Sequence, residues 1–183
     1  MDIPIDNSNT VIETERLILR PWQESDLDDF YAYASVPGVG EMAGWPYHQS
    51  IDTSREILQG FITAKNDFAI VHKQDKKVIG SIGIHKSWAT GHEDYKHLKS
   101  KKIGYVLAKD YWGQGLVPEA AKAVINHCFT TLGLDAITIE HFISNNQSRR
   151  VIEKCGFQYL WDDTYYSKLM DQHFEEKKYI LFK

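Results

Sequence analysis

The sequence predicts a mixed α/β fold of the α+β kind, in which a mostly antiparallel central sheet of about seven strands is flanked by about four helices. Three observations predict it. Segments with alternating or β-branched residues recur along the chain. Segments with apolar residues at helical spacing lie between them. The resulting order, β-α-α-β-β-β-α-β-α-β-β, starts with antiparallel neighbours and lacks the regular alternation of a βαβ winding.

The first expected strand is followed by two helices, each of which starts at a capping residue. Ser25 and Asp28 have the spacing of a capping box, with Asp in place of the usual Glu. Asp52 is a suitable N-cap for the second helix. A stretch that contains glycine and proline separates the two helices as a loop. The expected ranges are 13–21 for the strand, 25–33 and 52–62 for the helices, and 37–46 for the loop.

A change from helical to alternating spacing indicates a β-hairpin in the middle of the chain. Its strands are expected over 67–72 and 77–85, joined by the polar turn 73–76. A long polar loop over 86–101 leads to the next strand, expected over 102–107.

The last third returns to alternating helices and strands. Gly133 and Gly156 are each placed to end a helix. The expected helices cover 116–131 and 147–155, and the expected strands cover 136–143, 157–161 and 178–182.

Bulk properties favour a single domain over residues 1–183, with 1–10 as a flexible N-terminal segment. A net charge of −4 argues against nucleic acid as a partner. The chain lacks a signal peptide pattern and any run of about twenty apolar residues, so we expect a cytoplasmic protein that does not enter a membrane. Cys128 and Cys155 are expected as buried free thiols. The histidines show no metal-ligand spacing, so no metal is expected.

The segment Trp112-Gly113-Gln114-Gly115-Leu116 has the character of a glycine loop that opens a helix. Glycines permit positive φ angles and close approach of a ligand to the backbone, and the free N–H groups of a helix start attract an anion. The segment lacks the Gly-Lys-Ser/Thr ending of an NTPase loop, and Pro118 occupies the third glycine position of a dinucleotide fingerprint. The alternative is a pair of glycines that serve only the turn.

A second segment, from Asn145 to Phe157, has the pattern of a strand exit, a capped helix and a glycine stop. Its structural interpretation is a capped amphipathic helix with Asn145 and Ser148 near its start.

Together the two segments resemble the GNAT N-acetyltransferase superfamily, in the branch of the ribosomal-protein N-terminal alanine and serine acetyltransferases. The family's pyrophosphate pattern is Gln/Arg-x-x-Gly-x-Gly/Ala. Gly113 and Gly115 match it, and Asp110 replaces the Gln or Arg. The branch pattern Asn-x-x-Ser-x-x-Val-x-x-Lys-x-Gly-Phe is matched at Asn145, Ser148, Val151, Lys154, Gly156 and Phe157. The element order read above also fits the family fold.

The resemblance implies acetyl-CoA as the donor and a primary amine as the acceptor, with direct attack of the neutral amine on the thioester. The backbone of residues 112–116 is expected to bind the pyrophosphate. The strand edge Tyr105-Val106-Leu107 is expected to pair with the amides of pantetheine, and the Leu107 amide to stabilise the oxyanion. Asn145 is expected to contact the pantetheine region as well.

For catalysis, the resemblance implies Glu140 as the general base and Ser148 as the group near the leaving thiolate. An exposed strand glutamate is the alternative for Glu140. The tyrosine that serves as acid in many relatives corresponds to Ile152 here. His85 and His141 lie on central strands and are secondary candidates for the base.

The acceptor is expected to bind at the loop over residues 36–50, where Glu41, Trp45 and Tyr47 are candidate contacts. Packing of the aromatic residues against the second helix is the alternative. The acceptor class stays open between a protein N-terminus and a small amine such as a polyamine, an amino acid or an aminoglycoside. A CoA-binding sensor without chemistry and a non-catalytic interaction domain are competing hypotheses. A homodimer is compatible with the family.

Overall fold

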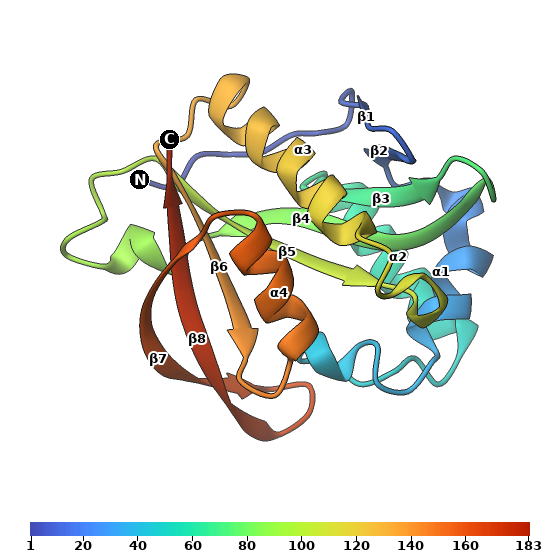
Figure 1. The fold of residues 1–183 in the computed structure, drawn as a ribbon. Helices are drawn as coiled ribbons and strands as arrows, with labels where there is room; N and C mark the ends of the chain where they lie inside the picture. The colour runs from blue at the N-terminus through green and yellow to red at the C-terminus, as the bar shows by residue number, and fades with distance from the viewer.

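A computed structural model describes residues 1–183 and contains one eight-stranded sheet with helices on both of its faces (Figure 1). The strand order in the sheet is β1-β2-β3-β4-β5-β6-β8-β7. The strands are β1 (Ile12–Glu13), β2 (Leu17–Pro21), β3 (Asp67–His72), β4 (Lys77–Lys86), β5 (Ser100–Leu107), β6 (Ala136–Phe142), β7 (Gln158–Ser167) and β8 (Gln172–Phe182). The helices are α1 (Leu27–Ala34), α2 (Ile51–Ala64), α3 (Leu116–Thr130) and α4 (Asn146–Lys154).

All neighbouring strands are antiparallel except β5 and β6. Those two pair only where Ser100–Lys102 lies beside Ala136–Thr138. Beyond this point they diverge, as Figure 1 shows, and residues 103–107 of β5 have no strand on that side. The prediction of a mixed, mostly antiparallel sheet is confirmed, and the divergence opens the sheet near its middle.

Two hydrophobic cores cover the two faces of the sheet. The larger core joins the sheet to α3 and α4 and includes the fully buried Ile82, Ile103 and Ile152. The smaller core joins the sheet to α1 and α2 through Trp22, Phe30 and Leu58. Burial of each large apolar side chain stabilises the fold by about 1.5–3 kcal/mol. The two cores therefore hold β5 from both faces while its edge stays open.

The first expected strand is in fact two short strands, and two expected helix caps are wrong. Residues 13–21 turn back on themselves, with Ile12 opposite Leu19. The first capping box is formed by Gln23 and Asp26, not by Ser25 and Asp28. Ser50, not Asp52, caps α2 by accepting from the N–H of Thr53. Ser50 has the extended backbone that an N-cap requires, whereas Asp52 already lies in the first turn.

The two last strands form a hairpin that is longer than the sequence predicts. The strands expected over 157–161 and 178–182 extend to Gln158–Ser167 and Gln172–Phe182. Most residues in the extension of β7 are exposed, so this strand lacks the apolar content that marks a buried one.

The N-terminal segment, expected to be flexible, lies against the body of the molecule. Ile3 and Ile5 pack against the larger core, and Asp2 forms an ion pair with the buried Lys101 at 2.6 Å. The Ser100 N–H donates to the Met1 carbonyl. Apolar packing, an ion pair and backbone hydrogen bonds all connect the segment to the rest of the chain.

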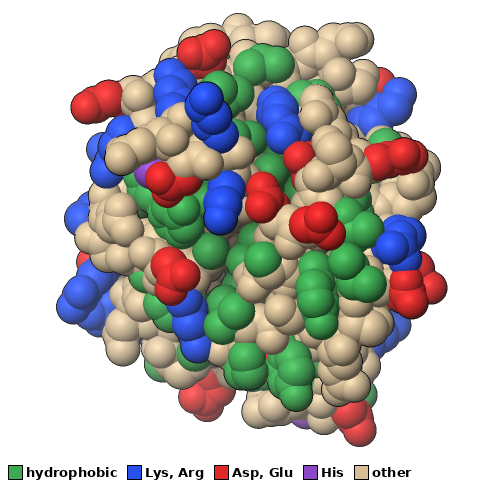
Figure 2. Space-filling model, turned by 90° about the vertical axis from the view of Figure 1, so that its right-hand side faces the viewer, with side chains coloured by type: hydrophobic (Ala, Val, Ile, Leu, Met, Phe, Trp, Pro, Cys, Tyr) green, Lys and Arg blue, Asp and Glu red, His purple; other side chains and the backbone are tan.

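Acidic and basic side chains are interspersed on the face shown in Figure 2. None of the helices has the length and apolar character needed to cross a membrane. Both cysteines are free, with Cys128 buried in the larger core and Cys155 half-buried. Burial raises the pKa of Cys128 to about 12, so its thiol stays protonated.

Candidate functional site

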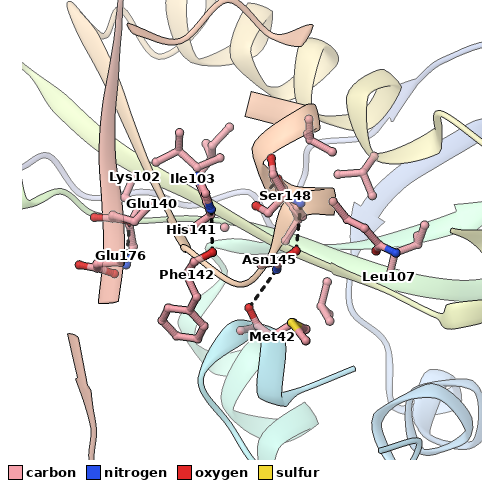
Figure 3. A pocket seen from close by; sticks show the side chains of 18 of the residues that line it. Met42, Lys102, Ile103, Leu107, Glu140, His141, Phe142, Asn145, Ser148 and Glu176 are labelled. Atoms are coloured by element: carbon pink, nitrogen blue, oxygen red, sulfur yellow. Dashed lines mark hydrogen bonds and ion pairs between the residues drawn. The ribbon is translucent and has the colours of Figure 1, made fainter. Parts of the chain in front are cut away.

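The divergence of β5 and β6 opens into a cavity of about 910 Å³. Its lining combines β5 and β6 with the glycine loop, α4, the loop after α1, the start of the loop after β4, and residues of β7 and β8 (Figure 3). Most of the sequence-predicted site residues line this one cavity, namely Tyr105, Val106, Leu107, Trp112, Gly113, Gly115, Leu116, Glu140, Asn145 and Ser148.

The open edge of β5 presents backbone groups to the cavity. The Ala108 N–H donates to the Ile79 carbonyl at 2.8 Å. Gly80 and Leu107 are therefore a pair without mutual hydrogen bonds in the antiparallel ladder. The N–H of Leu107 consequently points away from β4, toward the divergence, and so does that of Tyr105 two residues earlier. The Leu107 carbonyl is already occupied, because it accepts from Trp112 Nε1 at 2.7 Å.

The glycine loop presents a cluster of free donors at the start of α3. Gly113 and Gly115 have φ angles of +77° and +76°, which only glycine adopts without strain. No backbone N–H of residues 113–117 donates to another group of the protein. Five adjacent donors at a helix N-terminus match the needs of a phosphate group.

Contacts between Glu119, Thr14 and Arg16, which we call the clamp, hold the glycine loop in place. Glu119, in the first turn of α3, accepts from the Thr14 hydroxyl at 2.6 Å and from Arg16 Nε at 2.7 Å. Arg16 also donates from Nη1 to the Gln114 carbonyl at 2.9 Å. Burial alone would raise the pKa of Glu119, but these hydrogen bonds lower it below the ordinary value, so the carboxylate stays charged. The clamp fixes the loop to the turn between β1 and β2.

One predicted loop residue, Gln114, points away from the cavity, and two basic residues of α4 line it without being predicted to do so. Gln114 does not line the cavity, and its side-chain amide donates to the Asp110 carbonyl. Arg150 and Lys154 line the cavity from α4. They are four residues apart, so they share one face of the helix. That spacing was visible in the sequence, but the direction of the face was not.

Asn145 and Ser148 link α4 to the loop over 36–50 and to β5. Asn145 Oδ1 caps α4 by accepting from the Ser148 N–H at 3.0 Å, and its Nδ2 donates to the Met42 carbonyl (Figure 3). The Ser148 hydroxyl lies 2.8 Å from the hydroxyl of Tyr105. Burial raises the pKa of Tyr105, so this phenol remains protonated. The sequence predicted only a backbone role for Tyr105, and its side chain adds a hydrogen bond to Ser148.

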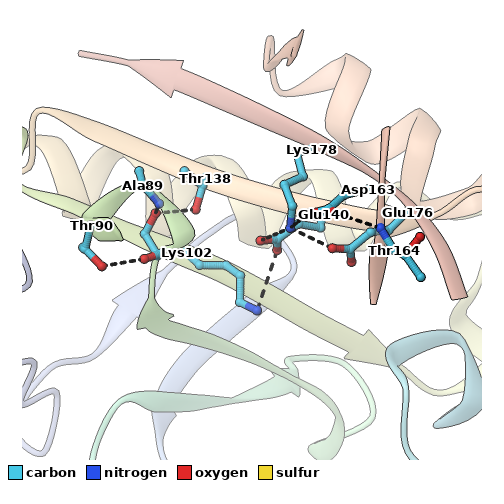
Figure 4. Close-up of polar contacts among 10 residues, drawn as sticks. Ala89, Thr90, Lys102, Thr138, Glu140, Asp163, Thr164, Glu176 and Lys178 are labelled. Atoms are coloured by element: carbon cyan, nitrogen blue, oxygen red, sulfur yellow. Dashed lines mark hydrogen bonds and ion pairs between the residues drawn. The ribbon is translucent and has the colours of Figure 1, made fainter. Parts of the chain in front are cut away.

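Glu140 lies in a charged cluster on the floor of the cavity (Figure 4). Its carboxylate is 3.7 Å from Lys102 Nζ and 3.9 Å from Lys178 Nζ. Lys178 is bound more closely by Glu176, at 2.7 Å, and by Asp163, at 3.3 Å. Burial raises the pKa of Glu140, although both lysines oppose the shift. A carboxylate in this state is better suited to accept a proton near neutral pH than an exposed one.

The two histidine candidates have structural contacts. His141 Nδ1 donates to the Phe142 carbonyl at 2.8 Å, and its Nε2 accepts from the Tyr179 hydroxyl at 3.1 Å. Burial lowers its pKa, which keeps the ring neutral. His85 does not line the cavity and lies beside Asn66 and Asp67. Neither ring has a free nitrogen directed at Glu140.

The loop over 36–50 reaches the cavity through residues other than those expected. Glu41 turns back to accept from the Gly38 N–H at 2.7 Å. Trp45 packs over Gly40, where a Cβ would lie 2.2 Å from its ring. Tyr47 is exposed and outside the lining. The cavity wall is formed instead by Val39, Met42 and Ala43 of the same loop.

Comparisons with known proteins agree on one family. Residues 16–158 match the family described as Acetyltransferase (GNAT) domain. An uncharacterized N-acetyltransferase of Bacillus subtilis, YoaA, is 29% identical over 153 residues, which are 81% of this chain and 82% of that protein. The ribosomal-protein-serine acetyltransferase of Escherichia coli is 25% identical over 157 residues, 82% of this chain and 83% of that protein.

Solved structures show the same fold at lower identity. An acetyltransferase (GNAT family) from Bacillus anthracis superposes with a TM-score of 0.81 at 21% identity, over 94% of this chain and 98% of that one. A ribosomal-protein-S5-alanine acetyltransferase from Vibrio fischeri superposes with a TM-score of 0.71 at 18% identity, over 95% and 97%.

Proposed function

Because the chain belongs to the GNAT acetyltransferase family, we propose that it transfers the acetyl group of acetyl-CoA to a primary amine by direct attack on the thioester. The proposal rests on two sets of backbone N–H groups that line the same cavity. The free N–H groups of residues 113–117 lie at one part of its wall, and the open edge of β5 forms another.

The residues present fit acetyl-CoA. The free amides of the glycine loop suit the pyrophosphate, and Arg150 and Lys154 add positive charge to the same cavity. The outward N–H group of Tyr105 suits the pantetheine arm, which would pair with β5 as an added strand does, and the N–H of Leu107 is left for the thioester carbonyl. Asn145 lies at the same opening.

Acetyl-CoA, when bound, supplies an activated acetyl group. Glu140 takes the proton that the acceptor ammonium must lose, directly or through one water molecule. The Leu107 N–H donates to the carbonyl oxygen as negative charge develops on it. The Ser148 hydroxyl, fixed by Tyr105, donates a hydrogen bond to the departing sulfur. Each role uses a group that lines the cavity.

Two acceptor classes follow from the comparisons and from the cavity. Some relatives are named ribosomal-protein acetyltransferases, which favours a protein N-terminus. A small amine also fits, because Met42, Trp88 and Glu140 line the same cavity of about 910 Å³. The competing function is a CoA-binding sensor without turnover. Its support is Ile152, which is fully buried where many relatives carry a catalytic tyrosine.

The test is a titration of acetyl-CoA and CoA by calorimetry, followed by thiol release with a panel of amines. The variant Gly113→Glu/Gly115→Glu places two carboxylates among the phosphate donors and serves as the binding-deficient control. Micromolar binding that the variant loses, together with thiol release that depends on an amine, is expected. Binding without turnover of any amine would favour the sensor. Absence of binding by the folded wild-type protein would refute both the acetyltransferase and the CoA sensor.

A further inference from the structure

Charge pairing beside β6 leaves Glu140 with only long ion pairs. Lys178 is held more closely by Glu176 at 2.7 Å and by Asp163 at 3.3 Å. Glu140 lies 3.7 Å from Lys102 Nζ and 3.9 Å from Lys178 Nζ, both beyond hydrogen-bonding distance.

Lys102 has no ion-pair partner other than Glu140. Lys86, which also lines the cavity, has none at all. A ligand that carries both an ammonium group and a carboxylate would satisfy this arrangement.

We propose that the acceptor is a free α-amino acid with an apolar side chain, whose amine faces Glu140 and whose carboxylate faces Lys102. The proposal rests on the proposed acetyl transfer. In an α-amino acid the nitrogen and the carboxyl carbon are only about 2.5 Å apart. Its two charges can therefore meet two protein groups that are themselves neighbours, as Glu140 and Lys102 are.

The wall beside Glu140 accounts for the apolar side chain. Phe142 lies two residues further along β6, on the same face of the sheet as Glu140. Its ring stacks on Tyr165 at 5.9 Å, and both rings line the cavity together with Met42. A large apolar side chain attached to the α-carbon would contact these three residues.

The same charges disfavour a polycation. A polyamine or an aminoglycoside brings several ammonium groups, whereas Glu140 is the one acidic side chain of the cavity that no lysine holds at hydrogen-bonding distance. The other ammonium groups would share the cavity with Lys86 and Lys102, and like charges repel. A carboxylate in their place removes this repulsion.

The experiment compares L-phenylalanine and L-methionine with the corresponding amino acid amides and with spermidine. Binding is measured by calorimetry to protein saturated with CoA, and turnover is measured as thiol release from acetyl-CoA. The variant Lys102→Met removes the charge, Lys102→Arg keeps it, and Lys77→Met is the control on an exposed end of β4 outside the cavity.

For Lys102→Met we expect the Kd and KM of the amino acids to rise about tenfold relative to those of the amides, because the change at Glu140 affects both ligands and the loss of the carboxylate partner affects only the acids. Lys102→Arg should restore part of the loss, and Lys77→Met should behave as wild type. The amine of an amide loses its proton more easily, so the ratio between variant and wild type is the decisive quantity.

Equal effects of Lys102→Met on acids and amides would overturn the proposal, as would tighter binding of spermidine. If no amine releases thiol, the acetyl transfer fails, while carboxylate-dependent binding to the CoA-saturated protein would still uphold the assigned ligand class. If amines are acetylated but the ligand carboxylate changes neither binding nor turnover, the acetyl transfer stands and the assigned ligand class is refuted.

Discussion

Replacement of Gly115 by alanine should weaken acetyl-CoA binding through backbone strain alone. Gly115 has a φ angle of +76°, and a Cβ at this position would meet only Arg16 Nη2, at 3.7 Å. The side chain therefore fits, and the cost comes from the left-handed conformation, about 1–2 kcal/mol for a residue other than glycine. The loop is exposed, so in the free protein it can relax to a conformation without strain.

Binding would then have to restore the strained conformation, because only that conformation aligns the free amides. A cost of about 1–2 kcal/mol corresponds to a Kd that is about 5 to 30 times higher. Isothermal titration calorimetry with acetyl-CoA measures this change directly, and thermal unfolding without ligand measures the effect on stability.

Gly133→Ala is the matched control. Gly133 follows the other end of α3, has a φ angle of +64°, is exposed, and has no atom within 4 Å of a Cβ. It carries similar strain about 22 Å from Gly115 along the helix. Gly133→Ala should leave the Kd unchanged. An unchanged Kd in Gly115→Ala, or an equal rise in both variants, would refute the assignment of the loop to phosphate binding.

Three further outcomes are expected. Glu140→Gln should lower kcat by about 10²- to 10⁴-fold. In the wild-type protein a base acts only when deprotonated, and burial raises the pKa of Glu140, so activity should fall as the pH drops through that raised pKa. Glu140→Gln should remove this acidic limb of the pH profile. Tyr105→Phe should lower the free energy of unfolding by about 0.5–1.5 kcal/mol and slow turnover. Its effect should not add to that of Ser148→Ala, because both variants remove the same hydrogen bond. Full additivity in a double-mutant cycle would contradict the pairing. Gly60→Ala, in the middle of α2 with no atom within 4 Å of the added Cβ, should stabilise the protein by about 1 kcal/mol in urea unfolding and leave activity unchanged.

The sequence was sufficient for the elements whose patterns are local. The helix that follows Gly115 and the hairpin over 67–86 lie where spacing and turn residues predict them. The long β7–β8 hairpin was only partly found, because its stability comes from pairing between strands and not from an apolar face of β7. The predicted N-cap of α2 is wrong because several polar residues near the helix start are suitable caps, and Ser50, not Asp52, has the backbone conformation of a cap.

For the site, the sequence indicated which segments matter better than which side chains do. Gly113, Gly115 and Asn145 line the cavity, and their binding roles stay predictions. In the loop over 36–50 the conspicuous residues, Glu41 and Trp45, contact the loop itself, and Met42 reaches the cavity. The charges around Glu140 come from β5, β7 and β8, so their proximity is a property of strand order, which no local pattern encodes.

The clamp at Glu119 couples ligand binding to the local unfolding of the N-terminal hairpin. Thr14 and Arg16 lie more than a hundred residues before Glu119, so closing this contact costs the unfolded chain considerable entropy. This contact links the N-terminal hairpin to the glycine loop. A ligand held by the loop would add its binding free energy to the free energy of opening both segments, and slower amide hydrogen exchange should extend to β1 and β2.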